Sequence, residues 1–299
     1  MSVQTSPWTG LLHDVAAADG PGPRVDLPAA TAAHVTAREG DAGDLVGAFV
    51  TLDETLPLLH GFQAPLFVRL TGGAGQVAGP AALATRTGLR LAGLELLLRD
   101  VADLAGNVRR VVAAVDAARG EGALDEEVPV YVEIPVDEPS RPWGQPSGSW
   151  LRAADEVAAA ELRLSLRLGG SHSDRFAAAP TVAAMVDAAL DRETPLRLTR
   201  TGVRAVTHRT ETADVPATAF GFANALLAVR RAFDGAGADA VTETLLETSP
   251  ETVAQWLAEE EFLAATRRWL TGWAPLHGTP IATAIDRAAA DLRSLGQRE

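Results

Sequence analysis

Acidic and imidazole side chains stand within or shortly after segments that alternate apolar and polar residues. Glu133 lies near the end of one such segment, Val128–Ile134, which reads V-P-V-Y-V-E-I. Two histidines, His172 and His208, follow later segments of the same kind. A carboxylate or an imidazole held beside a substrate can transfer a proton to or from it. We therefore predict Glu133, His172 and His208 as catalytic residues.

Arginines and glycines near the same segment ends predict an anion-binding pocket. A planar guanidinium binds a carboxylate or phosphate through two parallel hydrogen bonds, and the amides of glycine loops bind anions as well. The predicted substrate-binding residues are Arg69, Arg167, Gly169, Gly170, Arg200 and Trp143. Trp143 belongs to the proline- and glycine-rich loop Asp137–Ser149, which we interpret as a lid over the ligand. The alternative is that Trp143 packs on a neighbouring helix or on another subunit.

Two other interpretations of these residues stay open. The arginines and glutamates could neutralise one another in the interior, since buried charges are retained when they are paired. A divalent metal ion could bind His172 and His208 together with Glu133 or Asp14. The six histidines show no regular ligand spacing, so our prediction includes no cofactor, and the metal ion remains the alternative.

The composition excludes several classes of chemistry. The chain has no cysteine, which removes disulfides, thiolate nucleophiles and thiolate-bound metals. It also has no lysine, which removes Schiff-base catalysis, covalently bound pyridoxal phosphate and the phosphate-loop lysine. The net charge of −13 argues against binding to nucleic acids or anionic membranes. Because no transmembrane or signal pattern is present either, we predict a cytoplasmic protein with a small anionic ligand.

The elements that must position these residues are alternating strands and helices. The clearest strand signal is Glu161–Gly170, E-L-R-L-S-L-R-L-G-G, in which leucine alternates with arginine or serine before two glycines. The predicted strands are Trp8–Asp14, Leu45–Leu52, Leu66–Thr71, Leu91–Arg99, Val128–Ile134, Leu162–Leu168, Leu196–Thr201 and Trp269–Leu276. The predicted helices are Pro28–Arg38, Asp53–Phe62, Leu104–Arg119, Trp150–Ala160, Thr181–Asp191, Phe220–Phe233, Thr248–Trp269 and Ala282–Leu295. This order predicts parallel βαβ units and a single α/β domain over residues 1–299, a (β/α)8 TIM-barrel-like fold, with residues 1–7 as a disordered tail.

A doubly wound open sheet would use the same elements, and the alternation within the strands separates the two folds. Central strands of an open sheet are covered on both faces and run continuously apolar. Here leucine, valine and isoleucine occupy one face of most strands, and polar or aromatic residues occupy the other. In a barrel the second set points inward, which predicts a charged interior. Its charged members are Arg69, Glu95, Glu133, Arg163, Arg167 and Arg197.

Several short motifs carry a resemblance to a known family. They are L-L-H-D-V-A from Leu11, D-L-V-G-A-F-V at Asp44–Val50, R-L-G-G at Arg167–Gly170, P-L-R-L-T from Pro195 with Gly202 after it, and G-F-A-N-A-L-L-A from Gly221. Together they resemble a family of actinobacterial barrel-like proteins with no assigned activity, which implies a barrel over most of the chain. Members usually carry a lysine at the position of Arg197, a His-His pair soon after Gly202, and Gly-Ser-Cys-Ser where this chain has Gly272–Pro275. If those residues carry the family's chemistry, this chain has lost or changed it.

Two hypotheses about function follow from these observations. The first is a small-molecule enzyme of the lyase, isomerase or hydrolase type that acts on a carboxylate or phosphate substrate without lysine or cysteine chemistry. The second is a catalytically silent barrel that binds a metabolite or a protein partner, which the departures from the family pattern favour. The oligomeric state stays open, with a homodimer as one alternative.

Overall fold

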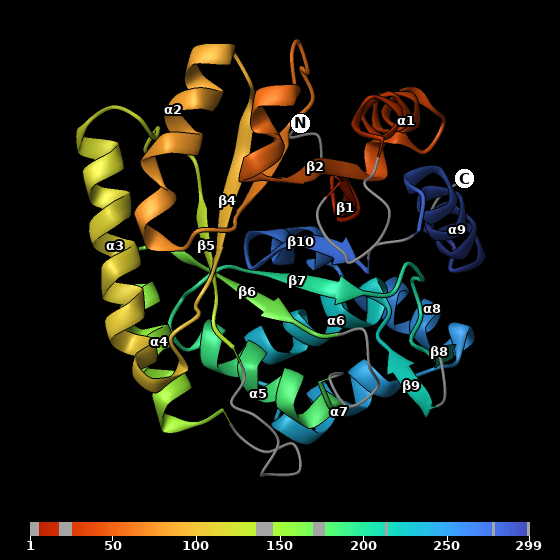
Figure 1. The fold of residues 1–299 in the computed structure, drawn as a ribbon. Coiled ribbons are helices and arrows are strands. Elements are labelled where there is room, and N and C mark those ends of the chain that lie inside the picture. Colours follow the sequence, from red (N-terminus) through yellow and green to blue (C-terminus); the bar gives the residue numbers. More distant parts are fainter. Residues whose placement is uncertain are drawn as a thin grey trace.

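The fold is a closed barrel of parallel strands. The structure, a computed structural model, describes residues 6–17, 26–135, 146–169, 177–212, 215–276 and 279–297. Within these residues eight strands close in the order β1, β10, β7, β6, β5, β4, β3 and β2 (Figure 1). Their bounds are β1 Leu12–Ala17, β2 Val46–Leu52, β3 Leu66–Leu70, β4 Leu91–Leu97, β5 Val130–Glu133, β6 Arg163–Arg167, β7 Leu196–Thr201 and β10 Leu270–Pro275. The predicted (β/α)8 fold is confirmed.

Helices surround this barrel (Figure 1). Their bounds are α1 Leu27–Glu39, α2 Ala78–Thr87, α3 Leu104–Gly120, α4 Gly148–Ala159, α5 Ala179–Leu190, α6 Phe222–Phe233, α7 Ala238–Leu246, α8 Pro250–Glu259 and α9 Ile281–Ser294. The first and last helices, α1 and α9, contact each other near the place where β1 pairs with β10. None of the helices that the structure describes is both long enough and apolar enough to cross a membrane.

The alternation of residue types decides which side chains face the helices. Leu66, Val68 and Leu70 of β3 belong to the large apolar core, as do the corresponding leucines and valines of β4 to β7. Residues between them point into the barrel, where Phe67 and Tyr131 form a second, smaller apolar cluster with Ala48 and Val50. The predicted division into an apolar outer face and a charged inner face therefore holds.

Two connections differ from the prediction. The short helix predicted over Asp53–Phe62 is a 3-10 helix that ends earlier, Asp53–Leu58. Pro57 lies inside it and cannot donate the hydrogen bond that a longer helix needs. Conversely, α2 forms in a glycine-rich stretch where no helix was predicted, because Ala81 and Ala84 are buried against the core. Tertiary packing outweighs weak local propensity here.

The connection from β7 to β10 is the longest departure from a regular barrel. It contains an antiparallel hairpin, β8 His208–Thr212 and β9 Val215–Ala219, followed by α6, α7 and α8. The helical region predicted over Thr248–Trp269 contains α8 and a 3-10 helix, Leu263–Arg268. Ser249 caps α8 by accepting a hydrogen bond from the Thr252 amide.

Candidate functional site

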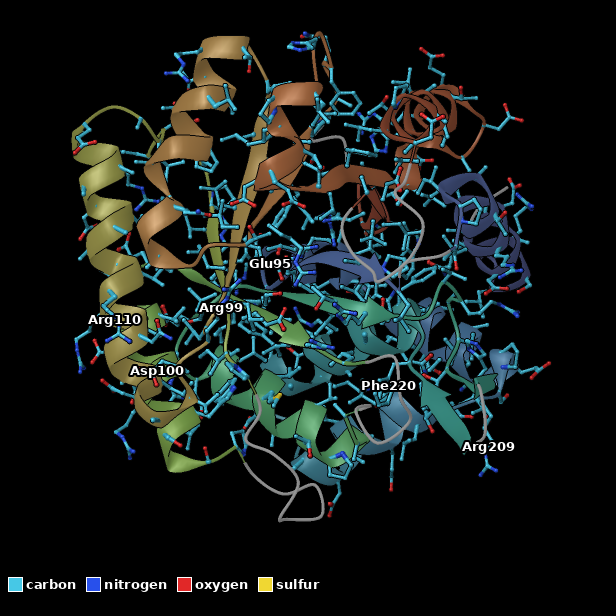
Figure 2. All side chains as sticks on the ribbon, viewed as in Figure 1. Glu95, Arg99, Asp100, Arg110, Arg209 and Phe220 are labelled. Carbon is cyan, nitrogen blue, oxygen red and sulfur yellow. The ribbon has the colours of Figure 1, made fainter. Side chains whose placement is uncertain are left out.

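A tightly bonded ion pair lies at the centre of the barrel interior. Glu95 on β4 and Arg197 on β7 are only 2% and 1% exposed, and Arg197 Nη1 lies 3.0 Å from Glu95 Oε2. Ser165 Oγ donates a hydrogen bond of 2.8 Å to the other oxygen, Glu95 Oε1. The guanidinium of Arg197 also stacks on the ring of Phe67, 3.8 Å from its centroid. Figure 2 shows Glu95 in the middle of the molecule among the barrel strands.

A second carboxyl group lies close to the first but is more loosely paired. Glu133 is the last residue of β5 and is 2% exposed. Arg69 Nη2 lies 3.5 Å from its Oε2, and Arg167 Nη1 lies 3.9 Å from its Oε1. Arg69 also approaches Glu95, with Nε 3.5 Å from Oε2, so it bridges the two carboxyl groups. Unlike Arg197, these arginines reach water, with side chains 19% and 31% exposed.

The pKa values of the two glutamates are shifted in opposite directions. Burial by itself would raise the pKa of Glu95, but the charges of Arg197 and Arg69 and the Ser165 hydrogen bond outweigh it and lower that pKa. Burial and the negative charge of Glu95 raise the pKa of Glu133 to about 7, although Arg69, Arg167 and Arg200 act against this rise. Glu95 is thus the permanent carboxylate, and Glu133 is the group that gains or loses a proton near neutral pH.

Glu133 and its two arginine partners lie at the same end of the barrel. Glu133 and Arg167 are the last residues of their strands, and Arg69 is the next to last of β3. Active sites of (β/α)8 barrels lie at the carboxyl ends of the strands. Of the predicted site residues, the structure therefore brings Glu133, Arg69 and Arg167 together at the expected end of the barrel.

Two other predicted site residues, Arg200 and Gly169, influence Glu133 and Arg167. Arg200 adopts a left-handed backbone conformation, with φ of 56°, and its positive charge lowers the pKa of Glu133. Gly169 accepts a hydrogen bond of 3.1 Å from Arg167 Nε through its carbonyl oxygen. This hydrogen bond helps to orient Arg167. The predicted contact of the Gly169 amide with an anion stays a prediction.

His208 is placed on the β8–β9 hairpin. Its Nδ1 lies 3.3 Å from the Val206 carbonyl oxygen, and no contact joins it to Glu133 among the described residues. Buried Asn224 on α6 accepts a hydrogen bond from the Thr207 amide and donates to the carbonyls of Thr244 and Glu247, which fixes the start of this hairpin. The remaining predicted residues, His172, Gly170 and Trp143, lie outside the described residues, as does most of the predicted lid Asp137–Ser149.

Of the residues predicted as alternative metal ligands, those that the structure describes lie apart from one another. Asp14 Oδ2 lies 3.1 Å from His34 Nδ1, and this pair is buried between the barrel and α1. Asp14 therefore faces away from the interior and is already engaged. Among the described residues, no three histidine, aspartate or glutamate side chains are grouped closely enough to hold a metal ion.

Sequence reasoning missed an interior histidine. The ring of His13 lies against Phe67, and a Cβ atom at Gly47 or Gly272 would come within 2.5 Å or 2.8 Å of it, so both glycines are required for the ring to fit. Burial, reinforced by the charge of Arg197, lowers the pKa of His13 well below its usual value. The available signals were the place of His13 in the predicted strand Trp8–Asp14 and in the L-L-H-D-V-A motif.

Near His13, polar side chains of the interior bond to one another. The Tyr131 hydroxyl accepts a hydrogen bond of 3.1 Å from Arg163 and lies 2.8 Å from Thr271 Oγ1. Thr271 in turn donates to the Leu196 carbonyl oxygen. This end of the interior is occupied by groups that bond to one another.

Comparisons of the chain with protein-family models, with curated proteins and with solved structures find no match. The resemblance to the actinobacterial barrel-like family stays a prediction. Arg197, which stands where members of that family carry a lysine, is the buried partner of Glu95. The function must therefore be argued from the geometry of the site itself.

Proposed function

We propose that the protein is a small-molecule enzyme of the lyase, isomerase or hydrolase type, in which Glu133 transfers a proton to or from an anionic substrate. The main support is that Glu133, whose pKa is raised, lies at the carboxyl end of its barrel strand beside Glu95, whose pKa is lowered. Glu133, with a pKa of about 7, can accept or donate a proton at neutral pH, which is the property that general acid–base catalysis needs.

The neighbouring groups have complementary roles in this proposal. Arg167, partly exposed at the mouth of the barrel, binds the anionic group of the substrate and places the reacting atom beside Glu133. Ionised Glu95 raises the basicity of Glu133 by electrostatic repulsion. Arg69, which contacts both carboxyl groups, limits the charge that accumulates when Glu133 is ionised. No covalent intermediate with lysine or cysteine is involved, since the chain has neither.

A silent binding barrel is the second candidate, and one observation favours it. Both oxygens of Glu133 lie within 4 Å of a guanidinium, from Arg69 and from Arg167. The charges could then serve only to neutralise one another and to hold an anion without turnover. The two candidates differ in whether Glu133 exchanges protons with a bound molecule.

Deuterium incorporation distinguishes these candidates. The protein is incubated in D2O with a panel of carboxylated and phosphorylated metabolites, and proton NMR follows the loss of C–H signals and the appearance of products. We expect exchange or turnover with at least one compound, and Glu133→Gln should slow it by about 100-fold or more. Glu126→Gln, a change at an exposed glutamate before β5, serves as the matched control and should have no effect. Binding without exchange by the wild-type protein would support the silent barrel.

A further inference from the structure

Thr199 has a buried hydroxyl without a visible structural purpose. The residue is 7% exposed, and its Oγ1 has no hydrogen-bond partner among the residues that the structure describes. It lies two residues after Arg197 on β7, on the inward-facing side of the strand, and it pairs in register with Arg167 on β6. Buried hydroxyl groups nearly always have a partner, because an unpaired one destabilises the fold. A bound ligand is therefore the expected partner of this hydroxyl group.

Among the residues that the structure describes, Arg167 beside it has hydrogen-bond donors without a partner. Its Nε donates to the Gly169 carbonyl oxygen, which fixes the plane of the guanidinium. Its Nη1 lies 3.9 Å from Glu133 Oε1, beyond the distance of a hydrogen bond. With the side chain 31% exposed, the two Nη groups can reach a ligand at the mouth of the barrel.

We propose that Arg167 and Thr199 together form a subsite for one carboxylate group of the substrate. The two Nη groups of Arg167 donate to the carboxylate oxygens, and the hydroxyl of Thr199 donates to one of them after rotation about χ1. This inference rests on the proposed function, which it sharpens by naming the substrate class as a carboxylic acid whose reacting atom lies beside Glu133.

The number of donors favours a carboxylate over a phosphate. One guanidinium edge and one hydroxyl match the two oxygens of a carboxylate, whereas the oxygens of a phosphate group need more donors or a helix N-terminus. Thr199 then acts as a residue that determines specificity, and its neighbour on the same strand offers a matched control. Thr201 is also buried, at 4% exposed, but its hydroxyl donates to the Ala274 carbonyl oxygen at 3.2 Å.

The test compares Thr199→Val with Thr201→Val in binding and in stability. Malonate binding is measured by isothermal titration calorimetry, with sodium phosphate as a second ligand and sodium chloride added to equal ionic strength. We expect Thr199→Val to weaken malonate binding by about tenfold, as befits loss of a hydrogen bond to a charged group, while the melting temperature stays equal or rises. Thr201→Val should lower the melting temperature and leave malonate binding unchanged.

Three results would overturn the subsite: unchanged malonate binding in Thr199→Val, a loss of melting temperature as large as in Thr201→Val, or tighter binding of phosphate than of malonate by the wild-type protein. These results are independent of the deuterium-exchange assay. Malonate binding that depends on Thr199 without any exchange would refute the proposed function and keep the subsite. Exchange that depends on Glu133 but not on Thr199 would refute only the subsite.

Discussion

Two carboxyl groups of the barrel interior have the same chemistry and different surroundings. Glu95 is bonded to a fully buried arginine at 3.0 Å and to a serine hydroxyl at 2.8 Å. Glu133 has guanidinium nitrogens at 3.5 Å and 3.9 Å, both from arginines that reach water. The first group is held as a carboxylate, and the second has a pKa of about 7.

This contrast shows how one network can serve both stability and chemistry. A buried charge needs close partners, and Glu95 has them. Once its charge is fixed, it raises the pKa of the less well paired neighbour by repulsion. In the proposed function, burial and the fixed charge of Glu95 together keep the pKa of Glu133 in the range that proton transfer needs.

The largest effect is expected for Glu95→Leu. The substitution leaves the guanidinium of Arg197, which is 1% exposed, without its carboxylate partner in the interior. We expect a loss of about 3–5 kcal/mol in the free energy of unfolding, the cost of stranding one member of a buried ion pair. Urea unfolding at pH 8 measures it. A loss below about 1 kcal/mol, typical of an exposed pair, would contradict the central role of this ion pair.

Glu133→Leu should lower the free energy of unfolding by less, about 2 kcal/mol, because the arginine partners of Glu133 can turn toward water. Glu133→Gln should cost less again, since the amide keeps the shape of the side chain and an acceptor for Arg69. The same unfolding experiment ranks all three variants. If Glu133→Leu lowered the unfolding free energy as much as Glu95→Leu, the two carboxyl groups would not differ in how tightly they are paired.

The pH dependence of stability tests the raised pKa directly. Between pH 4.5 and about 7 the folded protein retains a proton on Glu133 that the unfolded chain has released. The stability from this proton is complete below pH 4.5 and is lost as the pH rises through about 7. We expect the unfolding free energy of the wild-type protein, relative to that of Glu133→Gln, to fall over this range. Parallel pH profiles for the two proteins would show that the pKa of Glu133 is not raised.

His13 makes the unfolding free energy change with pH in the opposite direction, and the comparison of the wild-type protein with Glu133→Gln cancels this contribution. Its pKa is lowered in the folded state, so the unfolded chain binds a proton below about pH 6.5 that the folded chain does not. Stability from His13 therefore falls as the pH falls below 6.5. Because both proteins in the comparison keep His13, their difference reports on Glu133.

The smallest stability effect is expected for Arg167→Gln. The side chain is 31% exposed, its ion pair with Glu133 spans 3.9 Å, and its hydrogen bond goes to the nearby Gly169 carbonyl oxygen. The unfolding free energy should therefore change by less than about 1 kcal/mol. Ligand binding should respond much more, with malonate affinity reduced by at least tenfold if Arg167 holds the carboxylate. Calorimetry and a thermal melt on the same sample measure both. A large loss of stability with unchanged binding would make Arg167 a structural residue.

The sequence alone determined the fold and the charged residues that the strands contribute to the barrel interior. A period of two residues assigns each side chain of a strand to one face, so the inward positions of Glu95, Glu133 and Arg197 follow from the alternation. The absence of lysine and cysteine excludes mechanisms that need a primary amine or a thiolate, whatever the fold.

Only the tertiary structure decided which charges pair and how closely. Partners across a barrel depend on the stagger between strands, which local alternation does not encode. Nothing in the pattern separates Glu95 from Glu133, yet one is matched with Arg197 and the other with two partly exposed arginines. The placement of Asp14 against His34 likewise depends on the packing of α1 on the barrel. The roles of these residues differ because burial and distance set their protonation, and both are properties of the folded chain.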